Sequence, residues 1–143
     1  MTELLIAAAS AVFAGISILV SMDWSRRQAT LEHLREVDRR VQEIWQIDVE
    51  QVQQHILDVY SGSGAPLSPD GARYMAFLNA VDLLAFARAN KVVHRKSVDR
   101  YARTLVPRTV DGRFIEALQS CLQDSEVYAD ILEYTRVLAK RKS

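Results

Sequence analysis

The feature that most constrains the fold is an apolar stretch, residues 4–22, that contains neither a charged residue nor a proline. Nineteen residues in a helix cover about 28 Å at 1.5 Å per residue, close to the hydrocarbon thickness of a bilayer. A buried helix of a soluble protein normally has a polar face, and this stretch offers only three serines. The sequence therefore predicts a transmembrane helix within an N-terminal anchor, residues 1–22.

A cleaved export signal is the main alternative for this stretch. The preceding residues, Met1-Thr2-Glu3, include no lysine or arginine, and the apolar core is longer than that of a typical signal. The end of the apolar core, just before Asp23, offers no small-x-small cleavage site. We therefore expect a retained span, with Trp24 as an aromatic anchor at the membrane interface.

Positive charge follows the span and predicts its orientation. Arg26 and Arg27 come directly after it, and Arg35, Arg39 and Arg40 follow. The positive-inside rule then places the C-terminal domain in the cytoplasm, and the N-terminus outside the inner (plasma) membrane. The alternative is an envelope coiled-coil protein with a periplasmic C-terminus, but such proteins usually have basic residues before the span.

Small residues recur every four positions within the span, at Ala7, Ala11 and Gly15. Such a ridge lets two helix backbones approach closely, so it predicts dimerisation or docking on another membrane protein. The alternative is that alanine and glycine are simply common in short spans.

The remaining sequence predicts an all-α fold, because no run shows sustained strand alternation. A long amphipathic helix is expected over residues 23–60, as one helix or two nearly collinear ones, with a possible break at 46–48 where Asp48 and Gln51 resemble a capping box. A linker, residues 61–71, precedes a small cytosolic helical bundle, residues 72–143, that packs on residues 23–60. Within it we expect helices from Ser68-Pro69 to Asn90, from Arg95 to a stop at Pro107, from Asp111, and from Asp124 or Ser125.

The helix that reads YMAFLNAVDLLAFARAN resembles an uncharacterised bacterial and phage family of small membrane-anchored helical proteins. The likeness rests on Phe77-Leu78-Asn79, Asp82 and Ala85, within a Tyr-Leu-Asn-x-x-Glu-like helix. Phe77 and Asp82 stand where that pattern favours tyrosine and glutamate, and His94-Arg95-Lys96 replaces an acidic turn. The resemblance implies a membrane-tethered helical domain without an assigned activity.

Asn79 and Asp82 are the candidate polar site, because they share one helix face. They are expected either to fix the packing of a neighbouring helix or to line a pocket of a small-molecule-responsive effector or enzyme. Three histidines without metal-ligand spacing and a single cysteine, Cys121, predict no metal, no disulfide and no catalytic constellation. We therefore expect no cofactor, and we lean against an enzyme.

Charge is uneven along the chain although the totals balance at 18 basic and 18 acidic residues. The balance argues against a nucleic-acid partner. A basic cluster predicts contact with anionic lipid or with an acidic protein face, or simply a solvated helix with intrachain pairs. Its members are Lys91, Arg95, Lys96, Arg100 and Arg103. The function predicted is therefore an interaction module with a protein partner or a homo-oligomeric state.

Overall fold

The computed structural model describes residues 2–141, which form six α-helices and no strand, so the all-α prediction is confirmed. The predicted outer boundaries at residues 1 and 143 lie outside the described residues. The helices are α1 (Thr2–Ile44), α2 (Val49–Tyr60), α3 (Pro69–Ala89), α4 (Arg95–Thr109), α5 (Gly112–Leu122) and α6 (Ala129–Lys140).

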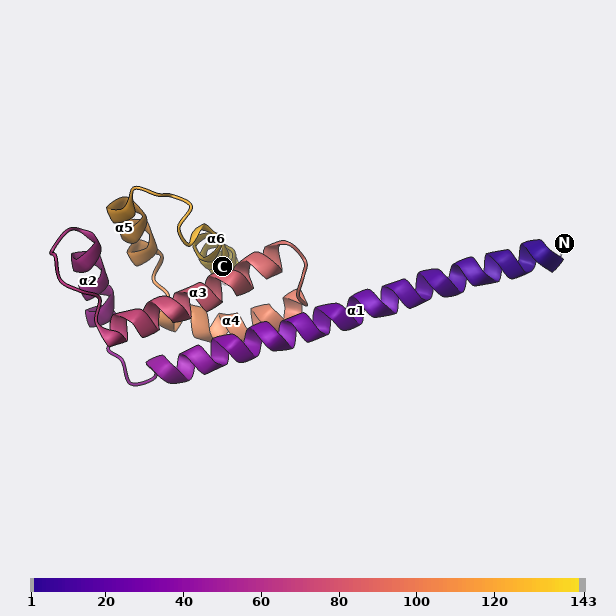
Figure 1. Cartoon of the computed structure of the whole chain (residues 1–143), viewed down its shortest axis with the longest axis horizontal. Helices are drawn as coiled ribbons and strands as arrows, with labels where there is room; N and C mark the ends of the chain where they lie inside the picture. The colour runs from indigo at the N-terminus through magenta and orange to yellow at the C-terminus, as the bar shows by residue number, and fades with distance from the viewer. Residues whose placement is uncertain (1, 142–143) are drawn as a thin grey trace.

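The first helix, α1, is continuous from the apolar stretch into the bundle. Its N-terminal part extends away from the other helices, and every residue from 2 to 28 is exposed (Figure 1). No proline interrupts it, and Gly15 is its only glycine. This helix is long and apolar enough to cross a membrane.

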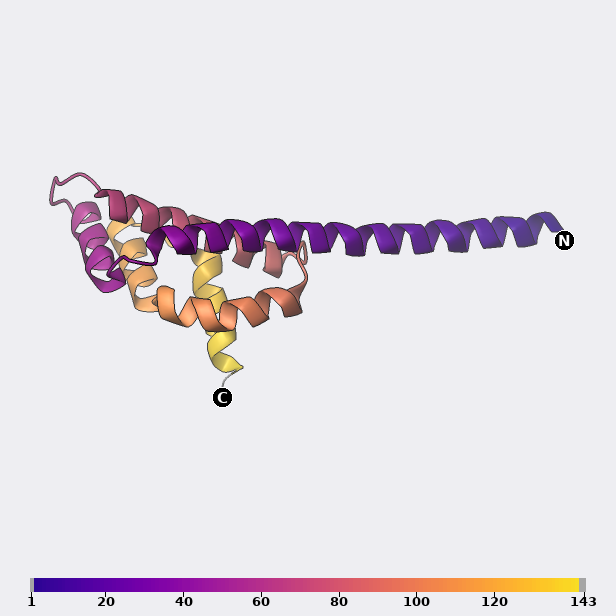
Figure 2. The same ribbon diagram turned by 90° about the horizontal axis from the view of Figure 1, so that it is seen from below.

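The C-terminal part of α1 packs alongside α3 and α4 (Figure 2). Val37 and Ile44 are buried in this contact, and Leu34 and Val41 are partly buried. The hydroxyl of buried Thr30 donates to the carbonyl of Arg26 at 2.6 Å and accepts from the backbone N–H of the α3–α4 turn. These four members of the apolar stripe predicted for this helix are therefore covered by the later helices of its own chain.

The predicted break in the long helix occurs where the capping box is. The α1 helix ends at Ile44, and the Asp48 carboxylate accepts from the backbone N–H of Gln51 at 3.3 Å to cap α2. The axis of α2 turns away from that of α1 (Figures 1 and 2). The collinear alternative is therefore wrong, because the connection of four residues lets the chain change direction.

The core is organised around α3, which contacts α1, α2, α4 and α6. Tyr74 and Phe77 are fully buried in it, and the Tyr74 ring meets Phe114 of α5 edge-on at 5.9 Å. The Tyr74 hydroxyl donates to the Thr109 carbonyl at 2.6 Å and accepts from Gln53 of α2 at 2.9 Å. One side chain thus joins three other helices to α3 while its own polar atom stays satisfied.

The α3 helix begins as its sequence predicts and ends slightly differently. The Ser68 hydroxyl accepts from the Gly71 N–H at 3.0 Å, with proline at the first helical position. The chain is therefore already helical at the last three residues of the predicted linker. Asn90 caps the C-terminus with φ −92°, and the next residue, Lys91, takes the left-handed conformation at φ 60°.

Two other boundaries differ from those expected. The α4 helix continues through Pro107 to Thr109, so the proline does not stop it and the helix ends two residues later. The α6 helix begins at Ala129 rather than at residue 124 or 125. The Gln119 side chain donates to the carbonyls of Ser125 and Val127, at 3.1 and 2.7 Å, and holds that segment as a loop.

Candidate interaction surfaces

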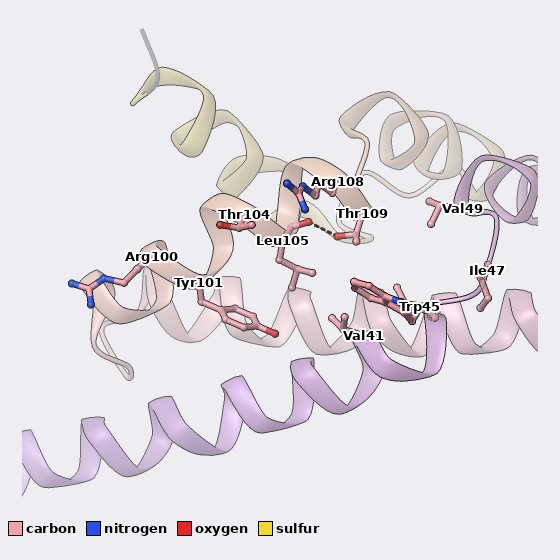
Figure 3. Close-up of a pocket in the computed structure, with 11 residues that line it drawn as sticks. Val41, Trp45, Ile47, Val49, Arg100, Tyr101, Thr104, Leu105, Arg108 and Thr109 are labelled. Carbon is pink, nitrogen blue, oxygen red and sulfur yellow. Dashed lines mark hydrogen bonds between the residues drawn. The ribbon is translucent and has the colours of Figure 1, made fainter.

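An open apolar groove lies between the C-terminal end of α1, the α1–α2 connection and α4 (Figure 3). Its volume is about 630 Å³. Tyr101 and Leu105 extend from α4 toward the side of α1 that carries Val41 and Trp45 (Figure 3). The residues that line it are Val41, Ile44, Trp45, Ile47, Val49, Arg100, Tyr101, Thr104, Leu105, Arg108 and Thr109. None of these is acidic, and two are arginines.

Trp45 is the most unusual residue of this groove. Its apolar spacing after Ile44 predicts a place in the core stripe, yet 81% of its surface is exposed. The reason is local, since α1 ends one residue earlier and the chain turns toward the Asp48 cap. An exposed tryptophan beside an apolar hollow is typical of the central residues of protein interfaces. Leu31, also of the predicted stripe, is 48% exposed.

Tyr101 brings a polar atom to the same groove. Burial and, next, the neighbouring Asp38 carboxylate raise the pKa of its hydroxyl above the ordinary value. The phenol therefore stays protonated throughout the physiological range, and its hydrogen bond to the Asp38 carboxylate also favours the protonated form.

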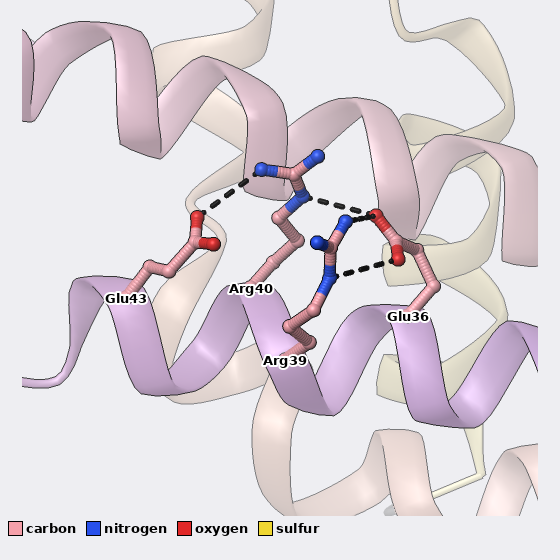
Figure 4. A network of polar contacts seen from close by, with 4 residues as sticks. All are labelled: Glu36, Arg39, Arg40 and Glu43. Atoms are coloured by element: carbon pink, nitrogen blue, oxygen red, sulfur yellow. Dashed lines mark hydrogen bonds and ion pairs between the residues drawn. The ribbon is translucent and has the colours of Figure 1, made fainter.

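One side of α1 carries a network of charged side chains, of which Arg39 and Glu43 are exposed and Glu36 and Arg40 are half-buried (Figure 4). Arg39 makes two hydrogen bonds to Glu36, at 3.1 and 2.9 Å. Arg40 bridges Glu36 and Glu43, at 3.0 and 3.1 Å. The Arg39 hydrogen bond is the main cause that lowers the pKa of Glu36. Arg39 and Arg40 are thus paired within the bundle.

Asn79 and Asp82 both bind the segment that begins α6. The Tyr128 hydroxyl donates to the Asn79 amide oxygen at 2.7 Å, and the Ile131 N–H donates to the Asp82 carboxylate at 3.1 Å. Burial raises the pKa of Asp82, with the Ile131 hydrogen bond acting in the opposite direction. Asp82 therefore satisfies a first-turn N–H of α6 from another helix, which is the packing role that the sequence offered as one alternative.

A buried ionic cluster around Asp99 was not anticipated from the sequence, which counts Asp99 only as a charge among arginines. Arg88 makes two hydrogen bonds to its carboxylate, at 2.6 and 3.1 Å, and Tyr134 donates at 2.6 Å. Arg141 also donates to it. Burial alone would raise the pKa of Asp99, but these hydrogen bonds hold it at about 2. The cluster joins α3, α4 and the end of α6.

The predicted basic patch is divided into two parts. Lys91, Arg95 and Lys96 lie with Arg26 of α1 around a cleft of about 310 Å³, which we call the proximal cleft. Its other lining residues are Asp23, Val93 and His94. Arg100 and Arg103 lie further along α4, in a separate hollow with Arg95, Lys96, Asp99 and Arg141. Only the first part is next to the apolar half of α1.

The remaining predicted residues are exposed on α1 or engaged locally. Ala7, Ala11, Gly15, Trp24 and Arg26 are exposed, and Arg27 pairs with Asp23 at 3.0 Å. No atom lies within 4 Å of the position that a Cβ would take at Gly15, so the ridge is open to a partner helix. The described residues contain no group of three or more His, Cys, Asp or Glu side chains that could hold a metal.

Comparison with protein-family models, with curated proteins and with solved structures finds no match for this chain. The resemblance to the membrane-anchored family stays a prediction.

Proposed function

We propose that this protein is a membrane-tethered interaction module that binds a partner helix in the apolar groove. Residues 4–22 cross the inner (plasma) membrane once, with the N-terminus outside and the bundle in the cytoplasm. Two features support the tether: the apolar half of α1 is exposed on every side, and the nearest basic residues follow it.

The observation that carries the proposal is the groove with its exposed Trp45. A tryptophan side chain that leaves 81% of its surface in water gains stability when a partner covers it. The apolar walls fit the apolar face of an amphipathic helix, which is a common mode of peptide recognition. Such a helix would place its apolar stripe in the groove, with the polar residues beside the stripe at the edges of the groove.

The charge of the groove indicates which charge the partner helix should carry beside its apolar stripe. Arg100 and Arg108 are the only charged residues among those that line it. Acidic residues beside the apolar stripe of the partner would pair with them, whereas basic residues would be repelled. The partner proposed is therefore an amphipathic helix with acidic flanks.

A direct test uses the full chain in mild detergent and two synthetic helical peptides. Both peptides carry the same apolar face, one with glutamate flanks and one with lysine flanks. In a Trp24→Phe background the fluorescence of Trp45 reports binding. We expect the acidic peptide to bind and shift the emission to the blue. Titration calorimetry, which needs no tryptophan, should show that Trp45→Ala lowers the affinity for this peptide by about tenfold or more.

The double substitution Arg100→Glu with Arg108→Glu should reverse the preference between the two peptides. Equal binding of both peptides, or binding that Trp45→Ala leaves unchanged, would overturn the proposal. Self-association that is abolished by Trp45→Ala would also overturn it, because the groove would then hold a second copy.

The orientation is tested by reporters joined after the bundle. Activity of a cytoplasmic reporter is expected. Activity confined to a periplasmic reporter would overturn the topology and favour the envelope alternative.

A further inference from the structure

The proximal cleft lies at a defined height above the apolar segment. Arg26 and Thr30 follow Met22, the last residue of that segment, by four and eight positions. At 1.5 Å per residue they lie about 6 and 12 Å beyond it along the helix. The polar headgroup layer extends about 5–8 Å beyond the hydrocarbon on each side of a bilayer. The cleft therefore begins within the headgroup layer, if α1 spans as proposed above.

The α3–α4 turn is held at this height by α1 itself. The backbone N–H of His94 donates to the Thr30 hydroxyl at 2.8 Å, and that hydroxyl donates to the Arg26 carbonyl. Val93, 2% exposed, anchors the turn in the core. The neighbouring basic side chains are thus fixed beside the point where α1 leaves the bundle.

The charge around the cleft is predominantly positive. Arg26, Lys91, Arg95 and Lys96 are exposed, and they face a single carboxylate, that of Asp23. Asp23 is already paired with Arg27 at 3.0 Å. The left-handed backbone of Lys91 places this lysine at the turn itself. An anion in the cleft would therefore meet several cations and only one carboxylate, which another arginine neutralises.

Two exposed apolar side chains lie close to these cations in the sequence, outside the lining of the cleft. Val92 lies within the turn and is 46% exposed, and Phe86 in the last turn of α3 is 51% exposed. Basic residues combined with exposed apolar ones are typical of surfaces that lie in a membrane interface. A soluble phosphate compound would gain nothing from the apolar members, whereas a lipid would.

We propose that the proximal cleft binds the phosphate headgroup of an anionic glycerophospholipid. Arg26 approaches the phosphate from α1, and Lys91 and Lys96 approach it from the α3–α4 turn. This binding fixes the rotation of the bundle against the membrane surface. The inference rests on the proposed membrane tether but not on the groove or its partner.

The test measures lipid binding to the full chain in neutral detergent by native mass spectrometry. Phosphatidylglycerol and phosphatidylcholine are compared on the wild type, on Lys91→Gln with Lys96→Gln, and on a matched control at two exposed arginines outside the groove, Arg103→Gln with Arg113→Gln. We expect phosphatidylglycerol to bind more tightly than phosphatidylcholine. The Lys91 and Lys96 variant should lose about tenfold or more of that affinity, while the control keeps it.

Each other outcome overturns the inference. Equal loss in both double variants would show attraction by overall charge and no defined cleft. Displacement of the lipid by free glycerol phosphate at comparable concentration would show a site for a soluble anion. Melting curves of all variants provide a check on folding, because the substituted lysines are exposed.

This experiment separates the inference from the proposed function. The Lys91 and Lys96 variant should still bind the acidic peptide in the groove. A chain that fails the peptide test but retains lipid binding would lose the groove proposal alone, and the reverse result would remove only the lipid site.

Discussion

The two halves of α1 are parts of one uninterrupted helix, yet they are built for different surroundings. Residues 4–22 carry no charge and are exposed on every side. From Thr30 to Ile44 the helix buries one face, with Val37 and Ile44 in the core, and carries the Glu36 network on the other. Helical geometry alone therefore does not distinguish them; the position of apolar and charged side chains around the axis does.

The difference shows what each half requires for stability. The bundle half has its stripe covered by α3 and α4, so its packing is provided within the chain. The apolar half has no such cover from the described residues, and its side chains need a nonpolar solvent or a partner. A single helix can thus pass from nonpolar surroundings into the bundle without any change in its backbone.

The strongest way to break this comparison is to give the apolar half the charges of the bundle half. Val12→Arg with Ile16→Arg should cost about 5–7 kcal/mol of membrane insertion, from the cost of arginine near the centre of a span. The fraction of protein resistant to alkaline carbonate extraction should therefore fall sharply.

The matched control places two arginines at exposed positions of α1 after the apolar half, by Gln28→Arg with Glu32→Arg. Extraction of this control should match the wild type. A span variant that stays fully in the membrane fraction would contradict the proposed tether.

Removing packing should affect only the bundle half. Ile44→Ala should lower the free energy of unfolding of the bundle by about 2–5 kcal/mol, because Ile44 is 4% exposed and a cavity would remain. Ile18→Ala, at a position 61% exposed, should leave bundle unfolding unchanged. Thermal or denaturant unfolding of the full chain in neutral detergent measures both. Equal destabilisation by the two variants would mean that the halves form one packed unit.

Lowering the pH should destabilise the bundle but not the apolar half of α1, with a smaller effect than the substitutions above. The pKa of Asp99 lies at about 2 in the folded chain against an ordinary 3.8, so its contribution is complete above about pH 4 and lost as the pH falls toward 2. This difference corresponds to about 2 kcal/mol. The apolar half has no such group, so its helical signal should persist when the bundle weakens.

Tyr134→Phe sharpens that test, because it removes one donor to Asp99 and so raises the carboxyl pKa in the folded state. The contribution of Asp99 should then be smaller than in the wild type, and its loss should be complete at a higher pH. Circular dichroism in neutral detergent, recorded between pH 5 and 2, follows the change. If bundle stability falls with pH as it does in the wild type, the Asp99 cluster does not control the loss of stability in acid.

Local sequence signals were enough to place most helices, and the misses have identifiable causes. The Asp48, Ser68 and Asp111 caps each hold the predicted helix start, because a cap depends on neighbouring residues only. The start of α6 was missed because Gln119 of α5 holds the preceding loop, a contact that spacing does not show. The positions of helix ends therefore follow from the sequence where the partners are local.

The candidate surfaces were harder to predict for the same reason. The exposure of Trp45 depends on where α1 stops, and the pairing of Asp99 with Arg88, Tyr134 and Arg141 joins residues far apart in the chain. The basic patch was visible as composition, but its division depends on the bond between His94 and Thr30. Periodicity identifies which faces are apolar, and only the tertiary arrangement decides which remain open.

The continuity of α1 has a mechanical consequence. With neither glycine nor proline between Met22 and Ile44, the helix has no hinge where it leaves the apolar segment. Trp45 lies 23 residues beyond Met22, which corresponds to about 35 Å along the axis. Tilting the rod by about 20°, an ordinary angle for a spanning helix, would sweep the groove sideways by about 12 Å. Because bilayer thickness sets such tilts, it would also affect the position at which the groove holds its partner.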